Sequence, residues 1–220
     1  TQLELSKAEV PESANVASLF KKGRGVNTLL FWLAFFMCLL TMYALGSWMP
    51  KLMMAAGYSM GSSLLFLLAM NIGAVIGTVS GGMLADRFHL KPVLMVLGVV
   101  GAIVLSLLGF EPPQLALYFM IALAGAASIG SQILLYSYVA QYYPLAVRST
   151  GIGWASAVGR SGAIIGPILI GMLLGMDLPH QYNFIAVGLP LLVVALAVTL
   201  ISKKDQAEEA EVKDVAVARN

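Results

Sequence analysis

Six apolar segments, each about 20 residues or longer, account for most of this 220-residue chain. They cover residues 28–48, 60–85, 92–110, 114–138, 149–175 and 182–201. A helix of ~20 residues rises ~1.5 Å per residue and crosses a bilayer core of ~30 Å. Because 59% of the residues are hydrophobic and only 11% are charged, a soluble domain could not bury this apolar surface. The sequence therefore predicts an all-α integral membrane protein, a bundle of six transmembrane helices.

Basic residues gather in alternate loops. One set of connections carries Lys21, Lys22, Arg24, Arg87, Lys91, Arg148, Lys203 and Lys204. The opposite loops hold Lys51 beside the acidic Glu111 and Asp177. Cytoplasmic loops are enriched in Lys and Arg. We therefore expect a multi-pass protein of a bacterial inner membrane with both termini in the cytoplasm.

Three regions follow from this pattern. Residues 1–25 form a polar cytoplasmic lead-in, with a short helix expected after Ser13, and residues 26–202 form the six-helix bundle. Residues 203–220 form an acidic tail, which we expect to be disordered. The first 25 residues contain no apolar core of a signal peptide. Since the chain opens on Thr1 rather than Met, we expect a fragment or a processed product.

Polar and aromatic side chains occur on particular helices and at helical spacing. The stripes are Trp32, Phe36, Leu39 and Tyr43; Asn71 and Thr78; Ser128, Gln132 and Tyr136; and Ser156 with Arg160. The third and sixth spans are nearly featureless. Polar stripes in the first two helices of each triplet indicate a 3+3 arrangement, which is typical of transporters built from repeated units.

Arg160 lies about midway along the fifth span, and no other span interior carries an ionised group. A central Arg costs roughly 2.5–3.5 kcal/mol on insertion, so such residues usually face the bundle interior or a watery cavity. We expect Arg160 to bind an anion that passes through the membrane. A structural ion pair or a snorkelling side chain is the alternative, just as the aromatic and amide stripes could serve helix packing alone.

Small residues at spacings of four predict close helix contacts. They are Gly73, Gly77 and Gly81 on the second span, and Gly151, Ala155, Gly159 and Ala163 on the fifth. Small residues at this spacing let helix backbones approach closely. Pro167 removes a helical hydrogen bond and favours a bend in the fifth span.

Two loop motifs carry a family resemblance. Residues 82–91, GMLADRFHLK, resemble the G-x-L-A-D-R-x-G-R-[RK] signature of the major facilitator superfamily, with His89 in place of Gly and Leu90 in place of a basic residue. Residues 143–151 (YPLAVRSTG) and 159–167 (GRSGAIIGP) are similar to the aromatic acid:proton symporter family. The resemblance extends over residues 15–202.

The resemblance implies that the chain is helices seven to twelve of a twelve-helix carrier, whose partner is an N-terminal six-helix half. It implies proton-driven transport of an aromatic carboxylate such as benzoate or hydroxybenzoate, without cofactor or metal. Arg160 would hold the carboxylate, Gln132, Asn71 and Tyr43 would bind ring substituents, and Trp32 or Phe36 would stack on the ring. The conformational contacts between the halves would use Asp86, Arg87, Lys91 and Arg148.

Other readings stay open. The substrate could be another small organic anion or a sugar, and the chain could be a channel or a non-transporting sensor. An enzyme is disfavoured because His89 and His180 fall in loops on opposite sides and no H-E-x-x-H or G-x-S-x-G string occurs. A net charge of +2 without a basic, aromatic-rich patch gives no indication of nucleic acid binding. No Asp, Glu or His lies inside a predicted span, so we expect the proton carrier in the partner half.

Overall fold

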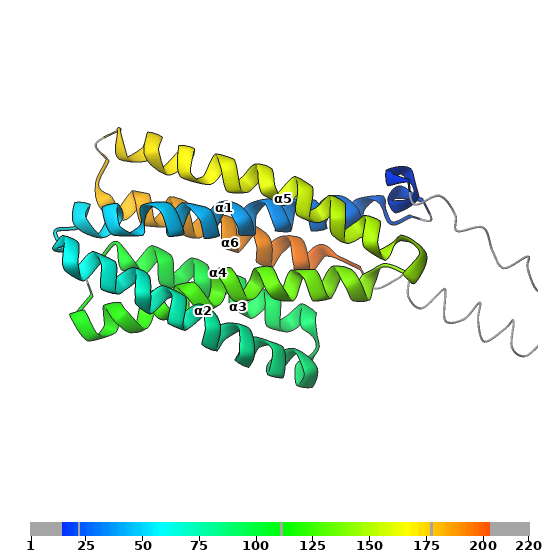
Figure 1. Ribbon diagram of the computed structural model, residues 1–220, viewed down its shortest axis with the longest axis horizontal. Coiled ribbons are helices and arrows are strands. Elements are labelled where there is room, and N and C mark those ends of the chain that lie inside the picture. The colour runs from blue at the N-terminus through cyan, green and yellow to red at the C-terminus, as the bar shows by residue number, and fades with distance from the viewer. Residues whose placement is uncertain (1–14, 22, 111, 177, 203–220) are drawn as a thin grey trace, which may run out of the picture.

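Six long helices run along one axis and form an elongated bundle (Figure 1). The computed structural model describes residues 15–21, 23–110, 112–176 and 178–202. The elements are the 3-10 helix η1 (Val16–Phe20) and the helices α1 (Gly25–Ala55), α2 (Met60–Phe88), α3 (Leu90–Leu108), α4 (Gln114–Tyr142), α5 (Leu145–Leu174) and α6 (His180–Leu200). Each of the six α-helices is long and apolar enough to cross a membrane. The predicted all-α six-helix bundle is confirmed, whereas residues 1–14 of the lead-in and the acidic tail lie outside the described residues.

Two helix ends differ from the sequence prediction. α1 continues through Pro50 to Ala55, beyond the predicted span of residues 28–48. Pro50 lies one turn before the end of the helix, where its missing N–H removes a single intrahelical hydrogen bond. α5 begins directly after Pro144, so Arg148 lies in its first turn and not in a loop. Proline suits a helix start because its missing N–H would have no helical partner there.

The contacts between helices follow the 3+3 pattern. The most extensive pairs are α1 with α5, α2 with α4, and α3 with α6, followed by α1 with α6 and α3 with α4. Exchanging the first triplet (α1–α3) with the second (α4–α6) maps α1–α5 onto α2–α4 and α1–α6 onto α3–α4, pairs of similar extent, and it maps α3–α6 onto itself. This is the pattern of two three-helix repeats related by a pseudo-twofold axis.

Glycines allow the main pairs to pack closely. A side-chain carbon added at Gly162 would overlap the Phe36 backbone carbonyl on α1, and one added at Gly73 would overlap that of Ala122 on α4. The buried stripe on α5 consists of Gly151, Ala155, Gly159, Gly162 and Gly166. The sequence predicted Ala163 as the fourth member, but the buried stripe continues at Gly162. Repeated steps of four drift around a helix of about 3.6 residues per turn, so a step of three is needed to stay on one face. Ala163 instead lines a hollow described below.

The connection between α2 and α3 consists of a single residue, His89. Asp86 and Arg87 therefore lie in the last turn of α2, and Lys91 lies in the first turn of α3, rather than in a longer loop. His89 has φ 68° and ψ 155°, a conformation that is essentially reserved for glycine. The sequence signature has glycine at this position, and the structure supplies the physical reason for it.

We expect His89→Gly to stabilise the protein by about 1 kcal/mol, because glycine removes backbone strain of about 1–3 kcal/mol and loses somewhat more chain entropy. Thermal unfolding of the detergent-purified full-length protein would measure the change in Tm. His89→Ala is the control, since it removes the imidazole but keeps the strain. Equal Tm values for the Gly and Ala variants would contradict strain at this turn.

Buried polar contacts fix the end of the bundle that carries Arg24, Arg87, Lys91 and Arg148, which we call the basic end. The Asn27 amide donates to the Tyr142 hydroxyl at 2.6 Å and to the Ser202 carbonyl at 3.2 Å, and Asn27 Oδ1 accepts from the Ser202 N–H at 3.2 Å. These bonds tie the end of α6 to the start of α1 and to the end of α4.

The predicted short helix of the lead-in is present as η1, and it packs on the bundle. Leu19 is fully buried, and its carbonyl accepts from the Thr28 hydroxyl at 2.9 Å. The Thr28 hydroxyl also lies 2.7 Å from that of Tyr143, which begins the turn into α5. η1 is thereby attached to both α1 and the α4–α5 connection.

Candidate functional site

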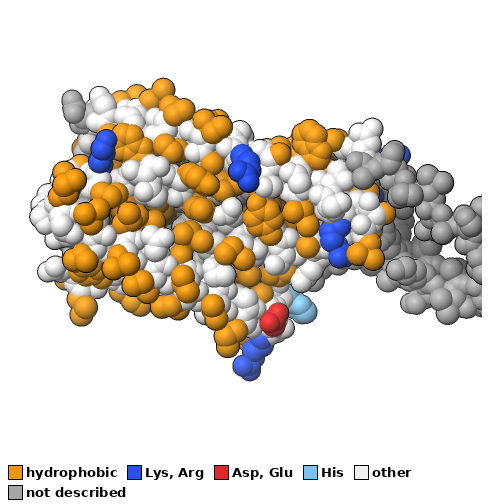
Figure 2. All heavy atoms as spheres, viewed as in Figure 1, with side chains coloured by type: hydrophobic (Ala, Val, Ile, Leu, Met, Phe, Trp, Pro, Cys, Tyr) orange, Lys and Arg blue, Asp and Glu red, His pale blue; other side chains and the backbone are white. Residues whose placement is uncertain are grey.

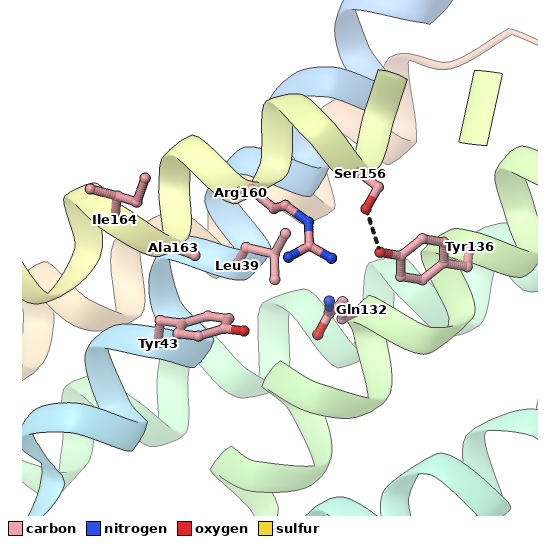
Figure 3. Close-up of a pocket in the computed structure, with 8 residues that line it drawn as sticks. All are labelled: Leu39, Tyr43, Gln132, Tyr136, Ser156, Arg160, Ala163 and Ile164. Carbon is pink, nitrogen blue, oxygen red and sulfur yellow. Dashed lines mark hydrogen bonds between the residues drawn. The ribbon is translucent and has the colours of Figure 1, made fainter. Parts of the chain in front are cut away.

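A hollow of about 370 Å³ opens between α1, α4 and α5. Its lining combines one charged, four polar or phenolic, and three apolar side chains: Arg160, Gln132, Tyr43, Tyr136, Ser156, Leu39, Ala163 and Ile164 (Figure 3). The stripes predicted on the first, fourth and fifth spans therefore meet in one place. Helices whose stripes face a shared space are the ones that can line a substrate pathway.

Arg160 extends from the middle of α5 into this hollow (Figure 3). Its side chain is exposed, and in the described part of the chain its guanidinium forms no ion pair and no hydrogen bond. Hydrophobic side chains are spread over the whole face shown in Figure 2, and basic side chains on it are sparse. The guanidinium thus retains its donors for an anion that enters the hollow.

Gln132 and Tyr43 lie across the hollow from Arg160. Gln132 projects from α4 and Tyr43 from α1, and both side chains point toward the space in front of the guanidinium (Figure 3). The Gln132 amide makes no hydrogen bond with the described residues, so its two donors and its acceptor are available. Three of the predicted substrate-binding residues, Arg160, Gln132 and Tyr43, are therefore brought together.

Tyr136 and Ser156 complete the polar lining, although the sequence analysis did not select them as site residues. Their hydroxyl oxygens lie 2.9 Å apart and connect α4 to α5. The sequence did contain a signal, because Tyr136 follows Gln132 by four residues and Ser156 precedes Arg160 by four.

The other predicted substrate-binding residues do not line the hollow. Asn71 is exposed on α2 and donates to the Leu67 carbonyl of its own helix at 2.8 Å. Trp32 stacks on Trp154 with ring centroids 5.9 Å apart and meets the edge of Phe20 from η1 at 5.6 Å. Phe36 is half-buried at the contact with α5. Their roles in binding stay predictions.

The four predicted conformational residues lie at the basic end in two different settings. Lys91 donates to the Ile201 carbonyl at 2.7 Å, and Arg148 donates to the Tyr143 carbonyl at 3.3 Å, so each caps the end of a neighbouring helix. Asp86 and Arg87 are exposed, and neither forms an ion pair within the described residues. The Arg87 guanidinium lies over the Phe88 ring, 5.6 Å from its centroid.

A membrane bundle of two exchangeable three-helix units with a polar hollow at mid-depth is the architecture of one half of a secondary transporter. The chain belongs to the Major Facilitator Superfamily, whose sequence pattern it matches over residues 31–218. The crystal structure of a transporter of this superfamily, FucP in the outward conformation, superposes with a TM-score of 0.76 at 16% identity. That match covers 89% of this chain and 47% of FucP, and it supports the fold.

Two curated relatives are close in sequence. The chain is 50% identical to the benzoate transport protein of Acinetobacter baylyi, and the match covers 87% of this chain and 41% of that protein. It is 44% identical to the gentisate transporter of Corynebacterium glutamicum, over 78% of this chain and 38% of the relative. The chain thus spans less than half the length of these relatives. The family and the relatives' names agree with the prediction of a carrier rather than an enzyme.

Proposed function

We propose that this chain is one half of a proton-driven carrier of aromatic carboxylates. The observation that carries the proposal is Arg160, whose guanidinium lies at mid-span, faces a polar hollow and forms no ion pair with any described residue. A cation in this position is costly unless it has a ligand or water to face. The names of the benzoate and gentisate relatives support an aromatic carboxylate as that ligand.

In this proposal Arg160 holds the carboxylate through paired N–H donors, which match the two carboxylate oxygens. Gln132 and Tyr43, on the opposite wall, contact the rest of the ligand, and Leu39 and Ile164 offer apolar surface to its ring. Trp32, Phe36 and Asn71 would contribute only if the hollow extends toward them in another conformation. Since this half offers no mid-span acid, the proton is carried by the partner half.

The partner half would cover α2 and α5. These are the least buried of the six membrane helices, and they correspond to each other under the exchange of triplets. α5 runs along one edge of the bundle (Figure 1), and its exposed side chains include Trp154, Ile164 and Ile168. With the basic end in the cytoplasm, Asp86 and Arg87 would contact the partner half there. Rocking of the two halves would then expose the hollow to each side in turn.

The test is uptake of radiolabelled benzoate and 4-hydroxybenzoate by cells that express the intact transporter. We expect accumulation against a gradient, and we expect a protonophore to abolish it because the proton gradient supplies the driving force. Accumulation that survives the protonophore would contradict proton coupling. Absence of uptake of either acid, with the protein present in the membrane, would favour the alternatives: another small organic anion, a sugar, or a non-transporting sensor.

A further inference from the structure

The hydroxyl groups of Tyr136 and Ser156 form a pair at one end of the hollow, beside Arg160 (Figure 3). Their oxygens are 2.9 Å apart. The Tyr136 ring meets the edge of the fully buried Phe35 at 4.9 Å with an interplanar angle of 86°, so the position of its hydroxyl is fixed by packing. Ser156 precedes Arg160 by one turn of α5, which places both on the same face of that helix.

The pair keeps hydrogen-bonding capacity after its own bond is made. Each hydroxyl has one hydrogen and two lone pairs, so one O–H donor and several acceptor sites remain. A phenolic hydroxyl both donates and accepts, and it therefore matches the pair. A carboxylate only accepts, and among the residues that line the hollow Arg160 alone is charged. The carboxylate of a ligand is therefore directed to Arg160, and the hydroxyl pair is left for a neutral polar group.

We propose that Tyr136 and Ser156 form a subsite for a meta or para hydroxyl of the aromatic acid that Arg160 holds. Side chains four residues apart on a helix have Cβ atoms about 5–6 Å apart. When the carboxylate of the ligand lies on Arg160, a substituent on the opposite side of the ring can therefore lie beside Ser156. An ortho hydroxyl stays next to the carboxylate and cannot reach the pair. This inference rests on the proposed function and specifies the substrates of the same site.

The hydrogen bond between Tyr136 and Ser156 also determines how strongly the site prefers a hydroxylated acid over benzoate. When benzoate is bound, the Tyr136 and Ser156 hydroxyls still bond each other, so neither hydroxyl is left without a hydrogen bond. A site whose polar groups are left bare by the wrong substrate discriminates by about 10⁴-fold or more. Here a ring hydroxyl adds about one net hydrogen bond, which corresponds to about threefold to tenfold in affinity. The carrier should accept both kinds of acid and favour the hydroxylated one moderately.

The experiment measures KM and Vmax for uptake of radiolabelled benzoate, 2-hydroxybenzoate and 4-hydroxybenzoate by the intact transporter. The variants are Tyr136→Phe, which keeps the ring against Phe35, and Ser156→Ala. We expect each to raise KM for 4-hydroxybenzoate about threefold to tenfold, and KM for the other two acids by less than about twofold. The double variant should be little worse than either single one, because both remove the same subsite.

Matched controls lie away from the hollow. Tyr118→Phe alters a tyrosine of α4 whose ring packs on Phe66, and Ser106→Ala alters a serine that bonds the Ala102 carbonyl of α3 at 2.7 Å. Neither should change the ratio of KM values between acids. That ratio within one variant is independent of how much protein reaches the membrane.

If KM in the Tyr136→Phe and Ser156→Ala variants rises equally for all three acids, or does not rise for 4-hydroxybenzoate, the subsite is overturned while the proposed function stands. Uptake of none of the three acids by the wild-type transporter overturns the proposed function and the subsite with it.

Discussion

Replacing Arg160 with alanine is expected to reduce Vmax/KM for an aromatic carboxylate by about thirtyfold or more. Loss of one partner from a desolvated charge pair costs roughly 2–5 kcal/mol, and each 1.4 kcal/mol is about tenfold. Arg160→Lys keeps the charge but loses the planar pair of donors, so we expect an intermediate loss of about tenfold or more. Initial rates of radiolabelled uptake over a range of substrate concentrations give both values.

Lys51→Gln is the control for charge alone. Lys51 is exposed near the end of α1 opposite the basic end, with its ammonium over the Trp48 ring, and it lies outside the hollow. We expect Lys51→Gln to change Vmax/KM by less than about threefold, because an exposed charge is screened by water and salt. Near-normal uptake by Arg160→Ala, with normal amounts in the membrane, would remove Arg160 from the binding site.

The second large effect is expected for Gly162→Ala. The added methyl group would overlap the Phe36 carbonyl, and backbone atoms cannot rotate out of the way as a side-chain end can. Overpacking costs about 1–3 kcal/mol, and contact with backbone lies at the upper end of this range or beyond. We expect Tm of the purified intact transporter to fall by at least about 5 °C, with lower yield of folded protein.

Gly153→Ala is the matched control on the same helix. No atom lies within 4 Å of a methyl group built at Gly153 in the described bundle. Alanine is favoured over glycine in a helix by up to about 1 kcal/mol, so Tm should stay the same or rise. If both variants unfold at the same temperature, the close contact between α1 and α5 is not what stabilises the bundle.

Helix number and type were predictable from the sequence because a bilayer imposes them. Backbone groups in hydrocarbon must be bonded within the segment, so an apolar run of about 20 residues has little choice but to form a spanning helix. The polar stripes were also visible, since spacings of three and four place side chains on one face regardless of the neighbours. Arg160, Gln132 and Tyr43 were identified in this way, and the structure places them around one hollow.

Helix ends were less predictable, because a proline acts according to its surroundings. Pro50 is accommodated inside α1, close to its end, while Pro144 precedes the first turn of α5. The same limit applies to Ala163, which the spacing assigned to the packed stripe. The buried members of the stripe are those that face α1, and which face of α5 meets α1 is a property of the two helices together.

The sequence by itself determined that this chain is a six-helix membrane bundle of the major facilitator type, with one cation at mid-span. The helices and the cation follow from local composition and from the cost of charge in hydrocarbon, whereas the superfamily was indicated by the resemblance of residues 82–91 to its signature. Only the tertiary structure decided which stripes share a space. Asn71 and Trp32 have the same periodic signal as Gln132 and Tyr43, but Asn71 bonds its own helix and Trp32 stacks on Trp154. The partner that a side chain meets is set by packing between distant segments, and no spacing along one helix contains that information.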